Sequence, residues 1–242
     1  SQGPVMAKDK NGIWITGASS GIGKATAVEF AKIGSIVFVS ARRVTELERL
    51  NRELKKEKLS VEMYPCNIAS SANVDQIVKK ILAANDIDCL VNNAGITSWK
   101  LAEENSTNEI DDVINTNLLG SIYTIKYLLP HFIERGGGTI INILSVVTKK
   151  TFTNSSIYAA SKMGLLGYSN VLREEVRKYK IRVINVIPGT TETPMWSQKV
   201  REEHSERMLN PEDVARVIVS SYLERKNIVT EEILVRPIEG DL

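Results

Sequence analysis

A tyrosine and a lysine stand four positions apart in the segment IYAASKMG, residues 157–164. In a helix, Tyr158 and Lys162 would share one face, because positions i and i+4 are neighbours there. An ammonium group beside a phenol favours the phenolate, so the lysine is expected to lower the tyrosine pKa from about 10. The spacing alone is not decisive, because Tyr222 and Lys226 repeat it in a predicted helix that offers no other chemistry.

A glycine-rich turn, TGASSGIGKA, follows the first apolar run and precedes a predicted helix. Gly17, Gly21 and Gly23 form the pattern G-x-x-x-G-x-G. A tight turn without side chains lets a pyrophosphate approach the backbone and the N-terminus of the next helix, so the pattern predicts a dinucleotide site. A P-loop is excluded, because Ala18 and Ala25 stand where that motif requires Gly and Ser or Thr. A tight turn without a ligand is the alternative.

The end of the second apolar run, VFVSARR, indicates which dinucleotide binds. An NAD site needs an acid there to accept hydrogen bonds from the ribose 2′-hydroxyl, and Ala41 stands in its place. Arg42 and Arg43 follow, and a guanidinium has the fork geometry that suits a phosphate. Ser19 in the glycine turn can add a hydroxyl donor. We therefore predict NADP(H), the alternative being that the arginines only cap the strand end in solvent.

Short apolar runs alternate with longer amphipathic segments along the whole chain. Val and Ile occupy both faces of these runs, as in a buried parallel sheet. The pattern predicts an α/β fold with a single-domain, Rossmann-type doubly wound parallel sheet of about seven strands, flanked by helices on both faces. The predicted strands are 12–16, 35–40, 61–66, 88–92, 138–144, 181–187 and 232–236, and the predicted helices are 22–33, 44–58, 72–84, 107–135, 156–179 and 211–225.

The composition is that of an ordinary globular protein, with 43% apolar and 25% charged residues in a chain of 242. A net charge of +2 gives no strong attraction to nucleic acid, and no apolar run approaches the ~20 residues that span a membrane. The sequence has no Cys/His cluster, so no metal site is predicted. Cys66 and Cys89, in apolar surroundings, are expected to be buried free thiols of a cytoplasmic protein. We expect residues 1–5 to be a cloning remnant and the domain to cover 6–242.

Six motifs follow one another in the order of a known family, and the chain resembles the compact short-chain dehydrogenases/reductases from residue 11 onward. Ser145 and Tyr158 are 13 positions apart, which is the spacing of that family. The C-terminal segment EEILVRPIEGDL is more similar to the branch of 3-hydroxy acid and general carbonyl reductases than to ketoacyl-carrier reductases. The six motifs are the glycine turn, NNAG at 92–95, Asn117, Ser145, Tyr158 with Lys162, and PG at 188–189.

The resemblance implies an oxidoreductase that transfers a hydride between NADP(H) and a carbonyl or alcohol. Tyr158 would be the general acid/base, and Lys162 would lower its pKa and bind the nicotinamide ribose. Ser145 would orient and polarise the substrate oxygen, while Asn117 would hold a water that links Lys162 to solvent. The expected cofactor contacts are Gly17, Ser19, Ser20, Gly21, Ile22, Gly23, Arg42, Arg43, Asn67, Ile68, Asn93, Ala94, Gly95, Tyr158, Lys162, Pro188, Gly189, Thr191 and Thr193.

Two segments bear on the substrate. Residues 194–209, PMWSQKVREEHSERML, follow the last cofactor contact and are predicted to form a lid with Met195 and Trp196 on its inner face. An amphipathic surface helix is the alternative. Lys149 and Lys150 lie between Ser145 and Tyr158 and could attract an acidic substrate, although loop lysines are usually solvated.

Two other functions are alternatives. A sensor that binds NADP(H) without turnover would have an incomplete catalytic tetrad, and all four residues are present. An epimerase or dehydratase of the extended branch would have a longer C-terminal substrate domain. In the family that the chain resembles, the helices expected at 107–135 and 156–179 pair across a two-fold axis. The resemblance therefore implies a homodimer or homotetramer acting on a small molecule, with no nucleic-acid or membrane partner.

Overall fold

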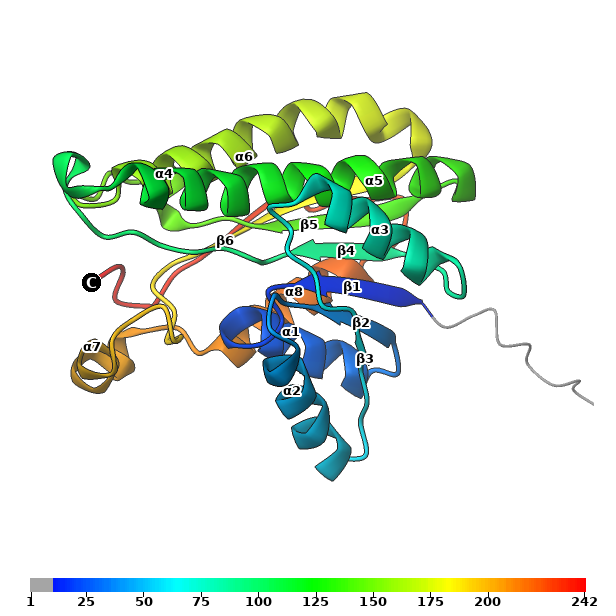
Figure 1. The fold of residues 1–242 in the computed structure, drawn as a ribbon, viewed down its shortest axis with the longest axis horizontal. Helices are drawn as coiled ribbons and strands as arrows, with labels where there is room; N and C mark the ends of the chain where they lie inside the picture. Colours follow the sequence, from blue (N-terminus) through cyan, green and yellow to red (C-terminus); the bar gives the residue numbers. More distant parts are fainter. Residues whose placement is uncertain (1–10) are drawn as a thin grey trace, which may run out of the picture.

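The computed structural model describes residues 11–242 (Figure 1). The expected cloning remnant at 1–5 and the expected start of the domain at residue 6 lie outside the described residues. Seven strands form one parallel sheet, as predicted. Their order across the sheet is β3-β2-β1-β4-β5-β6-β7. The strands are β1 (Gly12–Thr16), β2 (Ile36–Ser40), β3 (Glu62–Met63), β4 (Cys89–Asn92), β5 (Gly138–Ile143), β6 (Ile181–Pro188) and β7 (Glu232–Val235).

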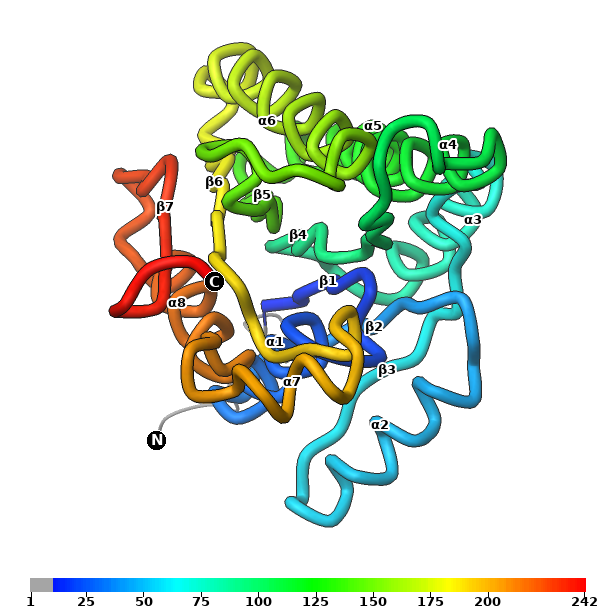
Figure 2. Tube along the Cα trace, turned by 90° about the vertical axis from the view of Figure 1, so that its left-hand side faces the viewer, coloured from blue at the N-terminus to red at the C-terminus, as the bar shows by residue number. Residues whose placement is uncertain are grey.

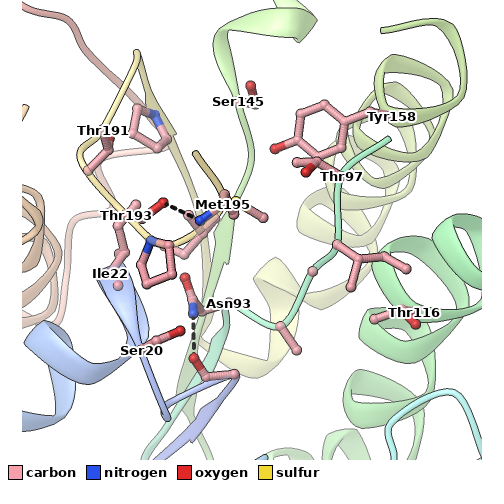
Figure 3. Close-up of a pocket in the computed structure, with 18 of the residues that line it drawn as sticks. Ser20, Ile22, Asn93, Thr97, Thr116, Ser145, Tyr158, Thr191, Thr193 and Met195 are labelled. Atoms are coloured by element: carbon pink, nitrogen blue, oxygen red, sulfur yellow. Dashed lines mark hydrogen bonds between the residues drawn. The ribbon is translucent and has the colours of Figure 1, made fainter. Parts of the chain in front are cut away.

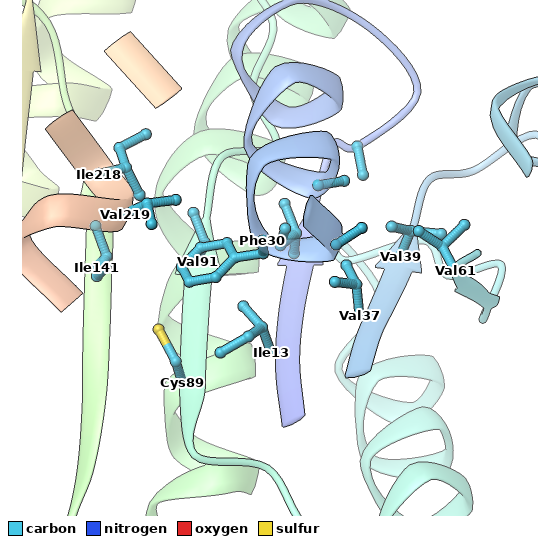
Figure 4. Close-up of a cluster of buried hydrophobic side chains, with 14 of the residues drawn as sticks. Ile13, Phe30, Val37, Val39, Val61, Cys89, Val91, Ile141, Ile218 and Val219 are labelled. Atoms are coloured by element: carbon cyan, nitrogen blue, oxygen red, sulfur yellow. The ribbon is translucent and has the colours of Figure 1, made fainter. Parts of the chain in front are cut away.

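Helices cover both faces of the sheet, which explains why the strands are apolar on both sides (Figures 1 and 2). One face packs against α1 (Gly21–Lys32), α2 (Val44–Lys56) and α8 (Pro211–Leu223). The other face packs against α3 (Ser71–Leu82), α5 (Gly120–Arg135) and α6 (Ser156–Val176). Figure 4 shows the first of these two cores. The fully buried Phe30 of α1 and Ile218 of α8 belong to one apolar cluster with Ile13 and Val91 of the sheet.

The predicted helix 107–135 consists of three consecutive segments. It begins with α4 (Thr107–Val113), continues through a π-helical segment, Ile114–Leu119, and ends as α5. Insertions of this kind are rare and are often found at functional sites. Here the insertion contains Asn117, one of the predicted catalytic residues. The predicted strand 61–66 is also shorter than expected, since β3 lies at the sheet edge and pairs with β2 alone.

The strand order reverses between β1 and β4, because β2 and β3 are added on one side of β1 and β4 to β7 on the other. The connections lead outward on either side of this point, so the loops after the two strands diverge and leave a crevice at their carboxyl ends. A short helix, α7 (Gln198–His204), lies in the connection between β6 and α8. Within residues 11–242 no helix is both long and apolar enough to cross a membrane.

Candidate active site

A pocket of about 660 Å³ opens at the carboxyl ends of the strands. Its walls come mainly from the segments that follow β1, β2, β3, β4, β5 and β6. Figure 3 shows Ser20, Ile22 and Asn93 toward one end of this pocket and Ser145, Tyr158 and Thr97 toward the other. The volume is within the range of sites for cofactors and small molecules. All the predicted cofactor contacts except Gly23 line it.

The glycine turn needs its glycines for two different reasons. Gly17 and Gly21 have φ values of +61° and +57°, which L side chains rarely adopt, and both line the pocket. Gly23 is buried behind the turn, and a Cβ there would lie 2.2 Å from the Gly17 carbonyl oxygen. Gly23 does not line the pocket, and its missing side chain lets α1 pack against the turn, so its cofactor contact stays a prediction.

Polar side chains hold this turn in place. The Asn93 Nδ2 donates a hydrogen bond to the Gly17 carbonyl at 3.0 Å (Figure 3). The backbone N–H groups of Asn93 and Ala94 both donate to the Thr16 Oγ1, each at 3.1 Å. The loop after β4 is thus tied to the loop after β1, and together they form an open cradle beside the N-terminus of α1. A pyrophosphate fits such a cradle.

The cationic end of the pocket is formed by the segment that follows β2. Arg42 and Arg43 both line the pocket and are exposed. Arg43 forms an ion pair with Glu46 at 2.7 Å, whereas Arg42 has no carboxylate partner within the described part of the chain. Ala41 also lines the pocket, so no acid stands where a ribose 2′-hydroxyl would need one. These residues fit the 2′-phosphate of NADP(H), with Arg42 as the available guanidinium.

The predicted catalytic residues lie at the other end of the pocket. Tyr158 lies in the first turn of α6 and is buried, with 7% of its surface exposed. Lys162, one helical turn later, donates to the Ile143 carbonyl at the end of β5, at 3.0 Å. Ser145 follows β5 by two residues and lines the pocket beside Tyr158 (Figure 3). The structure therefore brings the predicted tyrosine, lysine and serine together.

The pKa values at this site differ from the expectation. Burial raises the pKa of Tyr158 to about 12, although a hydrogen bond to Ser145 acts in the opposite direction. Burial lowers the pKa of Lys162 to about 8. The lowering of the Tyr158 pKa by Lys162 stays a prediction, because the Lys162 Nζ lies 5.8 Å from the ring centroid and donates to the Ile143 carbonyl here. A phenol that keeps its proton is suited to donate it to a carbonyl undergoing reduction.

Asn117 is fully buried and uses its side chain to join protein segments. The Oδ1 accepts from the Ile96 N–H at 2.8 Å, and the Nδ2 donates to the Ile96 carbonyl at 2.8 Å and to the Ser161 Oγ at 3.1 Å. A Cβ on Gly95 would lie 3.3 Å from the Asn117 Oδ1 and 3.6 Å from the Lys162 Nζ, so these two groups approach the same point. The backbone carbonyl of Asn117 accepts from the Ser121 Oγ at 3.2 Å, and the water that Asn117 was expected to hold stays a prediction.

An aromatic wall that the sequence did not reveal covers Tyr158. Trp99 stacks on Trp196 with 5.7 Å between ring centroids and 23° between ring planes. Its centroid also lies 5.8 Å from that of Tyr158. Trp196 was predicted to face inward from the lid, but Trp99 was missed. The available signal was its position, four residues after Gly95 in the loop that follows β4.

The lid prediction and the lysine prediction have different outcomes. Met195 and Trp196 line the pocket, in agreement with an apolar inner face of the segment 194–209. Lys149 instead forms an ion pair with Glu232 of β7, and Lys150 lies over the Phe152 ring at 5.2 Å. Neither lysine lines the pocket, so the structure contradicts the expectation that they attract an acidic substrate.

Comparisons with known proteins agree with this geometry. The family model described as short chain dehydrogenase matches residues 11–204. The sepiapterin reductase of Chlorobaculum tepidum is 35% identical over 241 residues, which cover 96% of this chain and 98% of the relative. The NADP-dependent 3-hydroxy acid dehydrogenase of Schizosaccharomyces pombe is 33% identical, covering 95% of this chain and 93% of the relative. A metagenomic short-chain oxidoreductase, solved in complex with NADP, superimposes with a TM-score of 0.83 at 29% identity, covering 94% of this chain and 96% of the other.

Proposed function

Because the chain belongs to the short-chain dehydrogenase family, we propose that Tyr158, Ser145, Lys162 and Asn117 form its catalytic group. The protein is an oxidoreductase that transfers a hydride between NADP(H) and a small carbonyl or alcohol compound. The observation that carries the proposed assignment is that Ser145 and Tyr158 lie at one end of a pocket whose other end presents Arg42. The same proposal treats residues 6–242 as one domain.

The proposed residues divide the reaction as follows. The nicotinamide, when bound, supplies the hydride that the carbonyl carbon accepts. Ser145 donates a hydrogen bond to the carbonyl oxygen, where negative charge develops. Tyr158 transfers its phenolic proton to that oxygen, which completes the alcohol and leaves a phenolate. Lys162 then stabilises the phenolate by its positive charge, and the reverse steps oxidise an alcohol.

We also propose that the substrate is flat and uncharged around its carbonyl. The charged residues that line the pocket are Arg42, Arg43, Glu46 and Lys162, and the first three lie at the end after β2. The end around Tyr158 has an aromatic wall, which favours planar ligands. One relative is named for sepiapterin, a flat pterin with a ketone in its side chain, and another for 3-hydroxy acids, which carry a carboxylate. The surroundings of Tyr158 support the first type.

A substrate comparison tests this proposal. NADPH consumption is measured with flat, neutral diketones or pterin ketones and with 3-oxo acids of similar size. The kcat/KM for the flat, neutral compounds should be higher, and Trp196→Ala should reduce that advantage about tenfold. Lys149→Ala with Lys150→Ala is the control and should change neither group of substrates. A preference for the acids would refute the substrate class, and silence with every compound despite NADPH binding would support the sensor.

We further propose a homodimer or homotetramer in a cytoplasmic setting. Met163 and Val171 on α6 are 49% and 61% exposed, which supports a contact between copies along this helix. Cys66 and Cys89 are buried free thiols, as in proteins from reducing compartments. Light scattering at micromolar concentration should give a mass of two or four chains.

A further inference from the structure

Ser161 stands between the two catalytic residues of α6, three positions after Tyr158 and one before Lys162. Its side chain is completely buried. The hydroxyl donates to the Tyr158 carbonyl at 2.7 Å and accepts from the Asn117 Nδ2 at 3.1 Å. One hydroxyl thus joins the turn of α6 that carries the tyrosine to the π-helical segment that carries the asparagine.

The Asn117 amide extends this connection to a third segment. An asparagine amide has two N–H donors, and Asn117 directs one to Ser161 and the other to the Ile96 carbonyl. Ile96 itself lines the pocket, directly after Gly95. Without the Ser161 hydroxyl, a buried N–H of Asn117 would lose its acceptor. The asparagine would then turn toward another acceptor, or α6 would shift against the loop.

We infer that Ser161 is a positioning residue for proton transfer. It fixes the turn that holds Tyr158 relative to the pocket loop and to Asn117, and it acts through those residues without touching the substrate. A displacement of the acid by a fraction of an ångström is enough to slow a reaction that needs close alignment. This inference rests on the proposed role of Tyr158 as the proton donor.

The same helix offers a matched control. Ser169, two turns after Ser161, is also completely buried. Its hydroxyl donates to the Leu165 carbonyl at 2.7 Å and accepts from the Asn142 Nδ2 at 2.8 Å. The two serines therefore make the same pair of hydrogen bonds, one to the backbone of the preceding turn and one from a buried asparagine. Neither Ser169 nor Asn142 lines the pocket.

The experiment compares Ser161→Ala with Ser169→Ala, with Tyr158→Phe measured alongside. Thermal melting should show a similar loss of stability in the two serine variants. Ser161→Ala should lower kcat about ten- to hundredfold, with the KM for NADPH little changed. The isotope effect on kcat with NADPH deuterated at the transferred position should increase, because the chemical step becomes slower. Ser169→Ala should keep the kcat and the isotope effect of the unmodified protein.

Each other outcome has a defined meaning. Equal kcat losses in the two serine variants, or no loss in Ser161→Ala, would overturn the inference. So would a Ser161→Ala variant that does not fold while Ser169→Ala does, because the hydroxyl would then be a requirement of folding. If Tyr158→Phe retains activity, the proposed proton donor is wrong. If Tyr158→Phe is inactive and Ser161→Ala is normal, only the positioning role fails.

Discussion

The chain contains a tyrosine and lysine four residues apart twice, at opposite edges of the same sheet. Tyr158 and Lys162 lie at the carboxyl edge, beside the end of β5. Tyr222 and Lys226 lie at the amino edge, where the Tyr222 hydroxyl donates to Asp88, the residue before β4. Both tyrosines are buried, with 7% and 3% of their surfaces exposed.

The two pairs differ in what surrounds the phenol. Burial raises the Tyr222 pKa, and the hydrogen bond to the Asp88 carboxylate raises it further, because a carboxylate holds the phenolic proton. Tyr158 has no carboxylate among the causes of its pKa shift, and it faces a pocket. The same spacing therefore occurs once with the proposed proton donor, at the carboxyl ends of the strands, and once with a structural hydrogen bond, at their amino ends. The groups around each Tyr–Lys pair, and not the spacing of the pair, therefore decide its function.

Among the substitutions that test this comparison, Tyr158→Phe should have the largest effect on activity. The kcat should fall roughly 10²–10⁴-fold, because the positioned acid is lost while the ring keeps its packing. NADPH binding, measured by fluorescence titration, should stay close to that of the unmodified protein. Wild-type kcat in this variant would mean that the two tyrosines do not differ in function.

Changing the other end of the same pocket should alter cofactor choice. A charge-assisted bond from Arg42 to the 2′-phosphate contributes about 1.5–3 kcal/mol, so NADPH should be preferred over NADH by roughly ten- to hundredfold. Ala41→Asp combined with Arg42→Ile should invert this preference, because it adds a repulsive acid as well as removing the cation. Steady-state kcat/KM for both cofactors is the measurement. Equal values in the unmodified protein would contradict the assignment of Arg42.

The sheet and most of the pocket could be predicted because their causes are local in the sequence. A strand buried on both faces is rich in Ile and Val on both sides, as β5 and β6 are, and a turn at positive φ favours glycine, as at Gly17 and Gly21. The residue types and order of the motifs then locate the chemistry. Gly23 is the instructive exception, since packing within the turn explains it as well as a ligand does.

Contacts between distant segments could not be predicted in this way. Tyr222 and Asp88 are 134 positions apart, and the sequence around Tyr222 does not indicate that its hydroxyl has a carboxylate partner. The partners of Lys149 and the stacking of Trp99 on Trp196 likewise depend on how loops meet after folding. Whether Lys162 lowers the pKa of Tyr158 depends on where the Lys162 amine points, and the spacing on a helix does not determine this.

Asp88→Asn should reduce stability in a pH-dependent manner. Burial alone would raise the Asp88 pKa, but Tyr222, Lys226 and Arg135 together hold it below its usual value. A carboxyl with a lowered folded-state pKa adds stability above its unfolded pKa of about 4 and loses it as pH falls through the folded value. The variant should therefore be less stable by roughly 2–3 kcal/mol at neutral pH, since Arg135, its ion-pair partner at 2.9 Å, is partly exposed.

Urea unfolding at neutral pH and at about pH 3 measures this difference. The gap between Asp88→Asn and the unmodified protein should narrow at the lower pH, because pH 3 lies below the unfolded pKa, where the stabilisation by the Asp88 charge is being lost. A gap that is independent of pH would mean that the Asp88 charge contributes nothing. The kcat at neutral pH should be unchanged, as expected for a residue at the amino edge.

Tyr222→Phe should have the smallest effect, and on stability alone. From the sequence no effect is expected, but the structure shows a hydrogen bond to a buried carboxylate. Its loss should lower the free energy of unfolding by about 1.5–2 kcal/mol, because Arg135 and Lys226 remain close to Asp88. Tyr168→Phe is the matched control, because the hydroxyl of Tyr168 makes no hydrogen bond within residues 11–242. A fall in kcat with unchanged stability would reverse the roles assigned to the two edges, whereas normal kcat with reduced stability would separate this tyrosine from Tyr158.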